Sequence, residues 1–117
     1  GGSRGADLGA RAIVRGIRFI SNRFGGLRTG LFANVVDCTA SENGGIGFSI
    51  GSSSRIAAVV ATANGGDGIE AGTATTVLDS TSNGNFGFGI DGDQLTISRN
   101  TVNGNQLGGI ILTTQGT

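Results

Sequence analysis

The chain has 117 residues, no formal net charge, 24 glycines, a single cysteine, and no histidine, proline, tryptophan or tyrosine. Because histidine is the commonest metal ligand and the usual proton carrier near neutral pH, its absence excludes zinc chemistry and Ser-His or Cys-His nucleophiles built from this chain alone. Hydrophobic residues make up 37% and charged residues 14%, a balance that indicates one folded domain rather than a disordered or collagen-like chain.

The first part of the domain is predicted to be extended. Residues 1–10 are expected to be a flexible N-terminal segment, and residues 11–117 a single domain. Five apolar residues have the spacing of a helical stripe: Leu8, Ala12, Ile13, Ile17 and Ile20. Gly9 and Gly16 interrupt that stripe, and glycine weakens a helix interior. We therefore predict strand for Ile13–Ile20.

Charge is distributed unevenly along the chain. Residues 1–30 carry a net charge of +5, and residues 31–117 carry −5. Five of the N-terminal arginines are candidates for an interface: Arg11, Arg15, Arg18, Arg23 and Arg28. They could attract an acidic polysaccharide or the acidic remainder of another copy. Only Phe19 and Phe24 are interleaved with them, which argues against nucleic acid, since single-stranded bases stack on aromatic side chains.

The middle and C-terminal parts of the chain repeat. Asn-Gly steps recur at intervals of 21, 19 and 20 residues, and we expect their asparagines to stack as a structural ladder: Asn43, Asn64, Asn83 and Asn103. Apolar residues alternate around each step, which is typical of strands with one buried face. A period near twenty predicts an all-β fold, a parallel β-helix of about five coils. Four unrelated hairpins are disfavoured, because hairpin turns separate strands by far fewer residues.

Stacking the repeats on these asparagines predicts the other columns. The inward columns are Phe48, Ile69 and Phe88, then Ile50, Ala71, Ile90 and Ile110, and Cys38 with Val59 and Leu78. The hydroxyl column Ser41, Thr62, Thr81 and Thr101 is either a hydroxyl ladder or a row that binds glycans. Cys38 is expected in the core, where it has no partner for an internal disulfide.

The stretches AIVRGIRFISNRFGGL (residues 12–27) and ISRNTVNGNQLGGIIL (residues 97–112) carry a strand, an asparagine and a Gly-Gly-apolar run in that order. Over residues 12–113 the chain resembles the right-handed parallel β-helix of the pectate-lyase-like superfamily. That resemblance implies the fold, and an extracellular or cell-surface location. Its members include polysaccharide lyases, glycoside hydrolases, phage tailspikes and bacterial surface proteins. Family enzymes generally wind ten or more coils and cap the N-terminal end with a helix, whereas this chain has room for about five coils and shows no clear cap.

A lyase of that superfamily would need a basic residue and carboxylates, and the candidates here are Glu70, Asp91 and Arg99. Counted from the nearest preceding Asn-Gly step, Glu70 lies at +6 and Asp91 at +8. They are therefore not expected to stack, which argues against a calcium cluster or a paired-carboxylate glycosidase. We assign no catalytic residue, metal or cofactor. The longest apolar run, Ile56–Ala61, is too short for a membrane span.

The leading hypothesis is a noncatalytic structural or assembly module that associates with itself end to end, or a core fragment of a longer β-helix. A parallel β-helix has two open ends, and oppositely charged ends favour head-to-tail stacking. The alternative is a β-helix that binds or degrades an acidic glycan. A phage-tail or adhesin segment is a third alternative.

Overall fold

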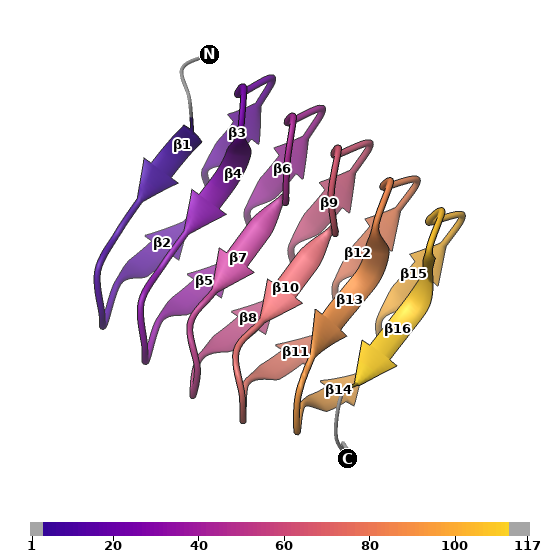
Figure 1. The fold of residues 1–117 in the computed structure, drawn as a ribbon. Coiled ribbons are helices and arrows are strands. Elements are labelled where there is room, and N and C mark those ends of the chain that lie inside the picture. Colours follow the sequence, from indigo (N-terminus) through magenta and orange to yellow (C-terminus); the bar gives the residue numbers. More distant parts are fainter. Residues whose placement is uncertain (1–3, 113–117) are drawn as a thin grey trace.

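The computed structural model describes residues 4–112, and these residues form three parallel sheets stacked as a solenoid of about five coils (Figure 1). Sheet A contains β1 (Arg4–Asp7), β4 (Gly25–Arg28), β7 (Phe48–Ile50), β10 (Ile69–Ala71), β13 (Phe88–Gly92) and β16 (Gly108–Leu112). Sheet B contains β2 (Ile13–Arg15), β5 (Asn34–Val36), β8 (Arg55–Ala57), β11 (Thr76–Leu78) and β14 (Thr96–Ser98). Sheet C contains β3 (Arg18–Ile20), β6 (Thr39–Ser41), β9 (Val60–Thr62), β12 (Thr81–Asn83) and β15 (Thr101–Asn103).

The winding confirms the predicted fold class. In Figure 1 the strands of sheet A lie in front and run downward, and the chain returns upward through the fainter strands behind while it advances to the right, which is a right-handed coil. Residues 13–20 contain β2 and β3, which confirms strand rather than helix there, but a corner at Gly16 with a φ of 68° divides the predicted single strand into two. The solenoid begins earlier than the predicted boundary at residue 11, because β1 pairs with β4. Predictions for residues 1–3 and 113–117 lie outside the described residues.

A ladder of asparagines runs through the interior. Its members occupy one position in successive coils, at spacings of 21, 21, 21 and 20 residues: Asn22, Asn43, Asn64, Asn85 and Asn105. Asn64 Oδ1 accepts hydrogen bonds from the backbone N–H and Nδ2 of Asn43, at 3.1 and 2.9 Å. Asn64 Nδ2 donates to Asn85 Oδ1 and to the Ala40 carbonyl, at 2.9 and 3.0 Å. The buried amide is therefore fully paired within the protein.

This ladder corrects the predicted one, because Asn83 and Asn103 do not belong to it. They end β12 and β15 and pair with each other on sheet C, in register with Thr62. The offset arises at the corner that follows each sheet C strand, which requires a positive φ. Glu42 and Ala63 adopt it in the second and third coils, with φ of 57° and 54°, whereas Gly84 and Gly104 adopt it in the last two. Asn-Gly thus marks the ladder in two coils and the corner in two others.

The same two-residue offset moves the columns inferred for the last two coils. Phe88 pairs with Gly108, and the column of Phe48 and Ile69 continues into Ile90. Leu78 pairs with Ala57 rather than joining Cys38 and Val59. Ile50 and Ala71 continue into Gly92, not Ile90. Ser41 and Thr62 continue into Asn83 and Asn103, while Thr81 and Thr101 follow Thr39 and Val60. The predicted hydroxyl column is therefore two columns.

The core consists of stacked side chains that differ from sheet to sheet. The main inward columns are Leu27, Phe48, Ile69 and Ile90 on sheet A, Val14, Val35, Ile56 and Val77 on sheet B, and Phe19, Ala40, Ala61 and Ser82 on sheet C. Phe19 meets Phe48 edge to face, with ring centroids 6.5 Å apart. Cys38 is 1% exposed, which confirms its prediction as a core residue.

We predict that Asn64→Ala lowers the free energy of unfolding by roughly 2–4 kcal/mol, because it leaves buried ladder donors and the Ala40 carbonyl without partners. Urea denaturation followed by circular dichroism measures the change. Asn83→Ala is the matched control and should cost less than about 1 kcal/mol, since within residues 4–112 its Oδ1 accepts one exposed hydrogen bond, from the Asn103 backbone N–H. Equal losses in the two variants would contradict the assignment of the ladder.

Candidate functional site

The open end of the first coil is hollow and apolar. A cavity of about 430 Å³ is lined by residues of β1, β2, β3 and the loops between them, including Ala6, Val14, Ile17 and Phe19. Ile17 is 44% exposed, although Cys38, the next residue of its column, is 1% exposed. The difference exists because no described residue covers the first coil from outside.

The last described coil presents the matching surface. Ile110 follows Ile90 in the inward column of sheet A, yet Ile110 is 47% exposed and Ile90 only 1%. Ile97 of β14 and Val102 of β15 follow the buried columns of sheets B and C and pack against the core while remaining partly exposed. Both ends thus expose positions that are core positions in the inner coils.

The predicted interface arginines surround the first coils instead of forming one patch. Arg15 in β2 and Arg18 in β3 are exposed on different sheets. The Arg11 guanidinium lies 5.3 Å from the Phe32 ring centroid, and that of Arg23 lies 5.5 Å from the Phe24 ring centroid. The fifth, Arg28, lies on the exposed face of β4 in the second coil.

Three carboxylates meet on the outer face of sheet A. Glu70 and Asp91 are direct partners in β10 and β13, which corrects the expectation that they do not stack. The sequence count failed because it started from Asn83, whereas the ladder residue of that coil is Asn85. Asp67 joins them, and carboxylate oxygens of the three residues lie within 4.8 Å of one another. Such a group of hard oxygen donors is chemically able to hold a divalent cation.

Asp67 is not among the predicted site residues, and it occupies the position of Ile46 and Phe88 in neighbouring coils. Its Oδ1 accepts a hydrogen bond from the Phe88 backbone N–H at 2.8 Å, which fixes the carboxylate at the edge of the cluster. Burial of the Asp91 carboxyl, with further contributions from the hydrogen bond and charge of Asp67 and the charge of Glu70, raises the pKa of Asp91 to about 6.

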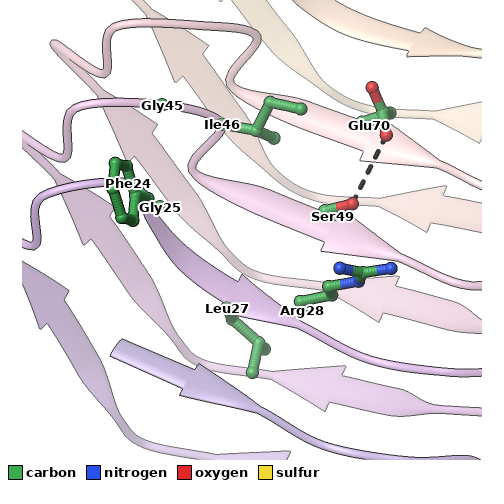
Figure 2. A pocket seen from close by; sticks show the side chains of 8 residues that line it. All are labelled: Phe24, Gly25, Leu27, Arg28, Gly45, Ile46, Ser49 and Glu70. Atoms are coloured by element: carbon green, nitrogen blue, oxygen red, sulfur yellow. Dashed lines mark hydrogen bonds between the residues drawn. The ribbon is translucent and has the colours of Figure 1, made fainter. Parts of the chain in front are cut away.

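A shallow pocket of about 400 Å³ lies beside this cluster (Figure 2). Phe24, Arg28, Ser49 and Glu70 contribute side chains to its lining, and Ser49 Oγ donates a hydrogen bond to Glu70 Oε1 at 3.3 Å. Arg28 and Ser49 are direct partners in β4 and β7. The pocket therefore combines a cation, a hydroxyl, a carboxylate and an exposed aromatic ring.

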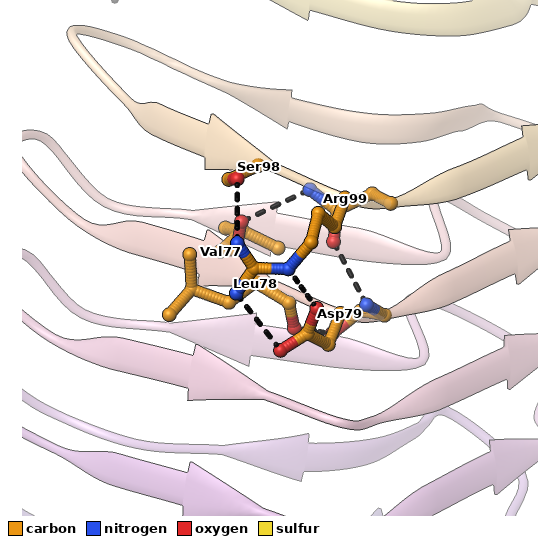
Figure 3. Close-up of polar contacts among 7 residues, drawn as sticks. Val77, Leu78, Asp79, Ser98 and Arg99 are labelled. Atoms are coloured by element: carbon orange, nitrogen blue, oxygen red, sulfur yellow. Dashed lines mark hydrogen bonds and ion pairs between the residues drawn. The ribbon is translucent and has the colours of Figure 1, made fainter.

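Arg99 is not part of either group. It lies at the corner between β14 and β15 and forms an ion pair with Asp79 at the equivalent corner one coil earlier, with Nε 2.7 Å from Oδ1 (Figure 3). The hydrogen bond from Arg99 lowers the pKa of Asp79. Both side chains are largely exposed, so this pair contributes little stability. The predicted grouping of Arg99 with Glu70 and Asp91 is therefore wrong, because those carboxylates lie on sheet A.

No protein-family model, curated protein or solved structure matches the chain. Within residues 4–112, no helix has the length and apolar character needed to span a membrane.

The carboxylate cluster predicts a specific pH dependence. A raised pKa in the folded state means that the native protein binds the Asp91 proton more tightly than the unfolded chain does, so stability falls as pH rises from about 4 to above 6. Asp91→Asn should reduce this fall and raise the Tm at pH 7. Thermal unfolding from pH 4 to pH 7.5 measures the effect, with the exposed Glu42→Gln outside the cluster as control. A Tm at pH 7 that is lower in Asp91→Asn than in the parent would contradict the assignment.

Proposed function

We propose that this protein is a noncatalytic structural module that associates end to end with copies of itself. The observation that carries the proposal is the exposure of core columns at the two ends of the described solenoid, at Ile17 in the first coil and Ile110 in the last. Burying apolar area of this kind is the main driving force for protein association. A longer β-helix whose further coils cover the same surfaces is the alternative explanation.

The backbone supports the same proposal. β1, β2 and β3 pair on one side only among the described strands, and so do β14, β15 and β16. Each unpaired edge offers N–H and C=O groups that another parallel strand can satisfy. A second copy supplies three such strands at once, with the spacing that the sheets already have.

Charge favours the head-to-tail arrangement. Residues 4–24 contain five arginines and one aspartate, whereas residues 67–112 contain five carboxylates and one arginine. Because the coils are stacked along one axis, the five arginines lie in the first coil and the five carboxylates lie in the C-terminal half of the solenoid, where the edge strands β14, β15 and β16 themselves carry no carboxylate (Figure 1). Opposite ends attract each other and like ends repel, with a range of about 10 Å at 0.1 M salt.

Multi-angle light scattering after size exclusion should give a mass that exceeds one chain, increases with concentration, and decreases as salt is raised. Ile110→Lys should shift the protein toward monomer, because it places a charge on the exposed core column. Ile111→Lys is the matched control, since Ile111 continues the outward column of Asp91 and should leave association intact. A parent protein that is strictly monomeric at every concentration and salt would overturn the proposal.

A second function is supported by the pocket of Figure 2: binding of an acidic oligosaccharide. Arg28 would pair with a uronate carboxylate, and the exposed Phe24 ring would contact the apolar face of a sugar.

For this function we predict that Arg28→Ala weakens binding of an oligogalacturonate about tenfold, the effect expected for loss of one charge-assisted hydrogen bond. Isothermal titration calorimetry measures the affinity. Arg55→Ala, on the exposed face of sheet B, is the control and should bind like the parent. Equal binding by the two variants, or no binding by the parent, would remove this function.

A further inference from the structure

The four Asn-Gly steps of the chain are candidate sites of a spontaneous covalent modification. In such a step the backbone nitrogen of the glycine can attack Cγ of the preceding asparagine, because glycine has no side chain that hinders the approach. The reaction needs an asparagine side chain that is free to turn toward its own backbone, and a glycine N–H that is not held in a hydrogen bond. The structure gives the four steps different freedom in both respects.

Two of the steps are held in the interior. Asn43 and Asn64 are 2% and 0% exposed, and their side-chain amides belong to the asparagine ladder. Their glycine nitrogens are occupied as well, since Gly44 N–H donates to the Asn22 carbonyl and Gly65 N–H donates to the Asn43 carbonyl, each at 2.8 Å. Attack on either side chain therefore requires the ladder to open first.

The third step is held at both reacting groups, although it lies on the outer face of sheet C. Asn83 is half-buried, and its Oδ1 accepts a hydrogen bond from the Asn103 backbone N–H at 2.8 Å. Gly84 N–H donates to the Asn103 carbonyl at 3.1 Å. The strand that ends at Asn83, β12, is paired on both sides, with β9 and β15. This step must break two hydrogen bonds before it reacts.

The fourth step is unrestrained. Asn103 and Gly104 are exposed, and within residues 4–112 neither the Asn103 side chain nor the Gly104 N–H has a hydrogen-bond partner. Asn103 ends β15, which pairs with β12 alone among the described strands and is therefore an edge strand of sheet C (Figure 1). Edges of this kind open locally at low free energy. We infer that Asn103-Gly104 is a modification site at which the folded protein deamidates ahead of the other three steps.

The reaction needs no reactant other than water. Gly104 N loses its proton to the solvent and bonds to Cγ of Asn103, the bond from Cγ to Nδ2 breaks, and ammonia leaves, so that a cyclic imide forms. Water then adds to either imide carbonyl and opens the ring to aspartate or isoaspartate. One water is consumed and one ammonia is released, nothing is oxidised or reduced, and residue 103 gains a negative charge.

The isoaspartate product alters the last coil. Its main chain passes through the former side chain of residue 103, which adds one backbone carbon between β15 and the ladder position Asn105. Asn105 Oδ1 accepts hydrogen bonds from the backbone N–H and Nδ2 of Asn85, at 3.0 and 2.9 Å. The added carbon displaces this acceptor, so conversion should release the side-chain amide of Asn85 at the last step of the ladder.

Peptide mapping by mass spectrometry, during incubation of the full chain in mildly alkaline buffer, tests the site. Because an associated copy would cover β15, the incubation uses low protein concentration and high salt, where the proposed end-to-end association is weakest. Cleavage after arginine places the candidate asparagines in separate peptides, except for Asn64 and Asn83, which fragment ions distinguish. The matched control is the same chain incubated in urea, where all four steps are exposed alike.

In the folded protein Asn103 should convert within about tenfold of its rate in urea, since its edge opens readily. Asn43 and Asn64 should be slowed by a factor of about 1,000 or more, because they react only from the small unfolded fraction. The variant Asn103→Gln should leave its peptide unmodified, since closure onto the longer side chain would require a larger and slower-forming ring.

Three results would overturn the inference: conversion of Asn103 in the folded protein as slow as that of Asn64, conversion of Asn43 or Asn64 as fast as that of Asn103, or a mass change that persists in the peptide of Asn103→Gln. Hydrogen exchange of the aged protein tests the effect on the last coil. Faster exchange of the Asn85 side-chain amide supports it, whereas unchanged exchange overturns that effect and leaves the modification site standing. None of these readouts requires that copies of the protein associate.

Discussion

The asparagine ladder determines how this chain can wind. An amide buried without partners is costly. Among the described residues, the ladder asparagines bond to asparagines of adjacent coils and to backbone carbonyls one coil back, and Asn85 also donates to the Ser82 hydroxyl. The coils must therefore keep a length of 20 or 21 residues, since any other length would break the row. Apolar columns provide most of the driving force, while the ladder fixes the register in which they stack.

Most of the fold could be predicted from the sequence, because every coil of a solenoid repeats the same spacing of strands, corners and buried residues. The period, the parallel strands, the strand at Ile13–Ile20 and the buried Cys38 all follow from local spacing and alternation. The register of the last two coils did not follow, since glycine has two uses in this chain. The glycine that follows Asn43 packs against the backbone of the neighbouring coil. Gly84 instead adopts the positive φ of the corner, which Ala63 adopts one coil earlier although it is not a glycine. The conspicuous Asn-Gly dipeptide concealed the constant interval between Asn43, Asn64 and Asn85.

That error explains what was missed at the candidate sites. With the correct register, Glu70 and Asp91 are direct neighbours, and Asp67 completes a carboxylate cluster. Burial of Asp91, followed by the hydrogen bond and charge of its neighbours, raises the pKa of Asp91. Arg28 and Ser49 join the same face, while Arg99 pairs with Asp79 at a different corner. The charge asymmetry needed no such correction, because in a solenoid the position of a residue along the sequence gives its height along the axis. In the described part of the molecule, the surfaces with unpaired strand edges and exposed core columns are the two ends of the solenoid rather than a catalytic cleft.

The most direct test of the ladder is side-chain amide NMR of the ¹⁵N-labelled protein in deuterated solvent. The side-chain amides of Asn43, Asn64 and Asn85 should exchange slowly, and nuclear Overhauser effects should connect each one to the next. The side-chain amides of Asn83 and Asn103 should exchange rapidly. Slow exchange at Asn83 with contacts to Asn64, in place of Asn85, would contradict the register on which the core, the ends and the proposed assembly all depend.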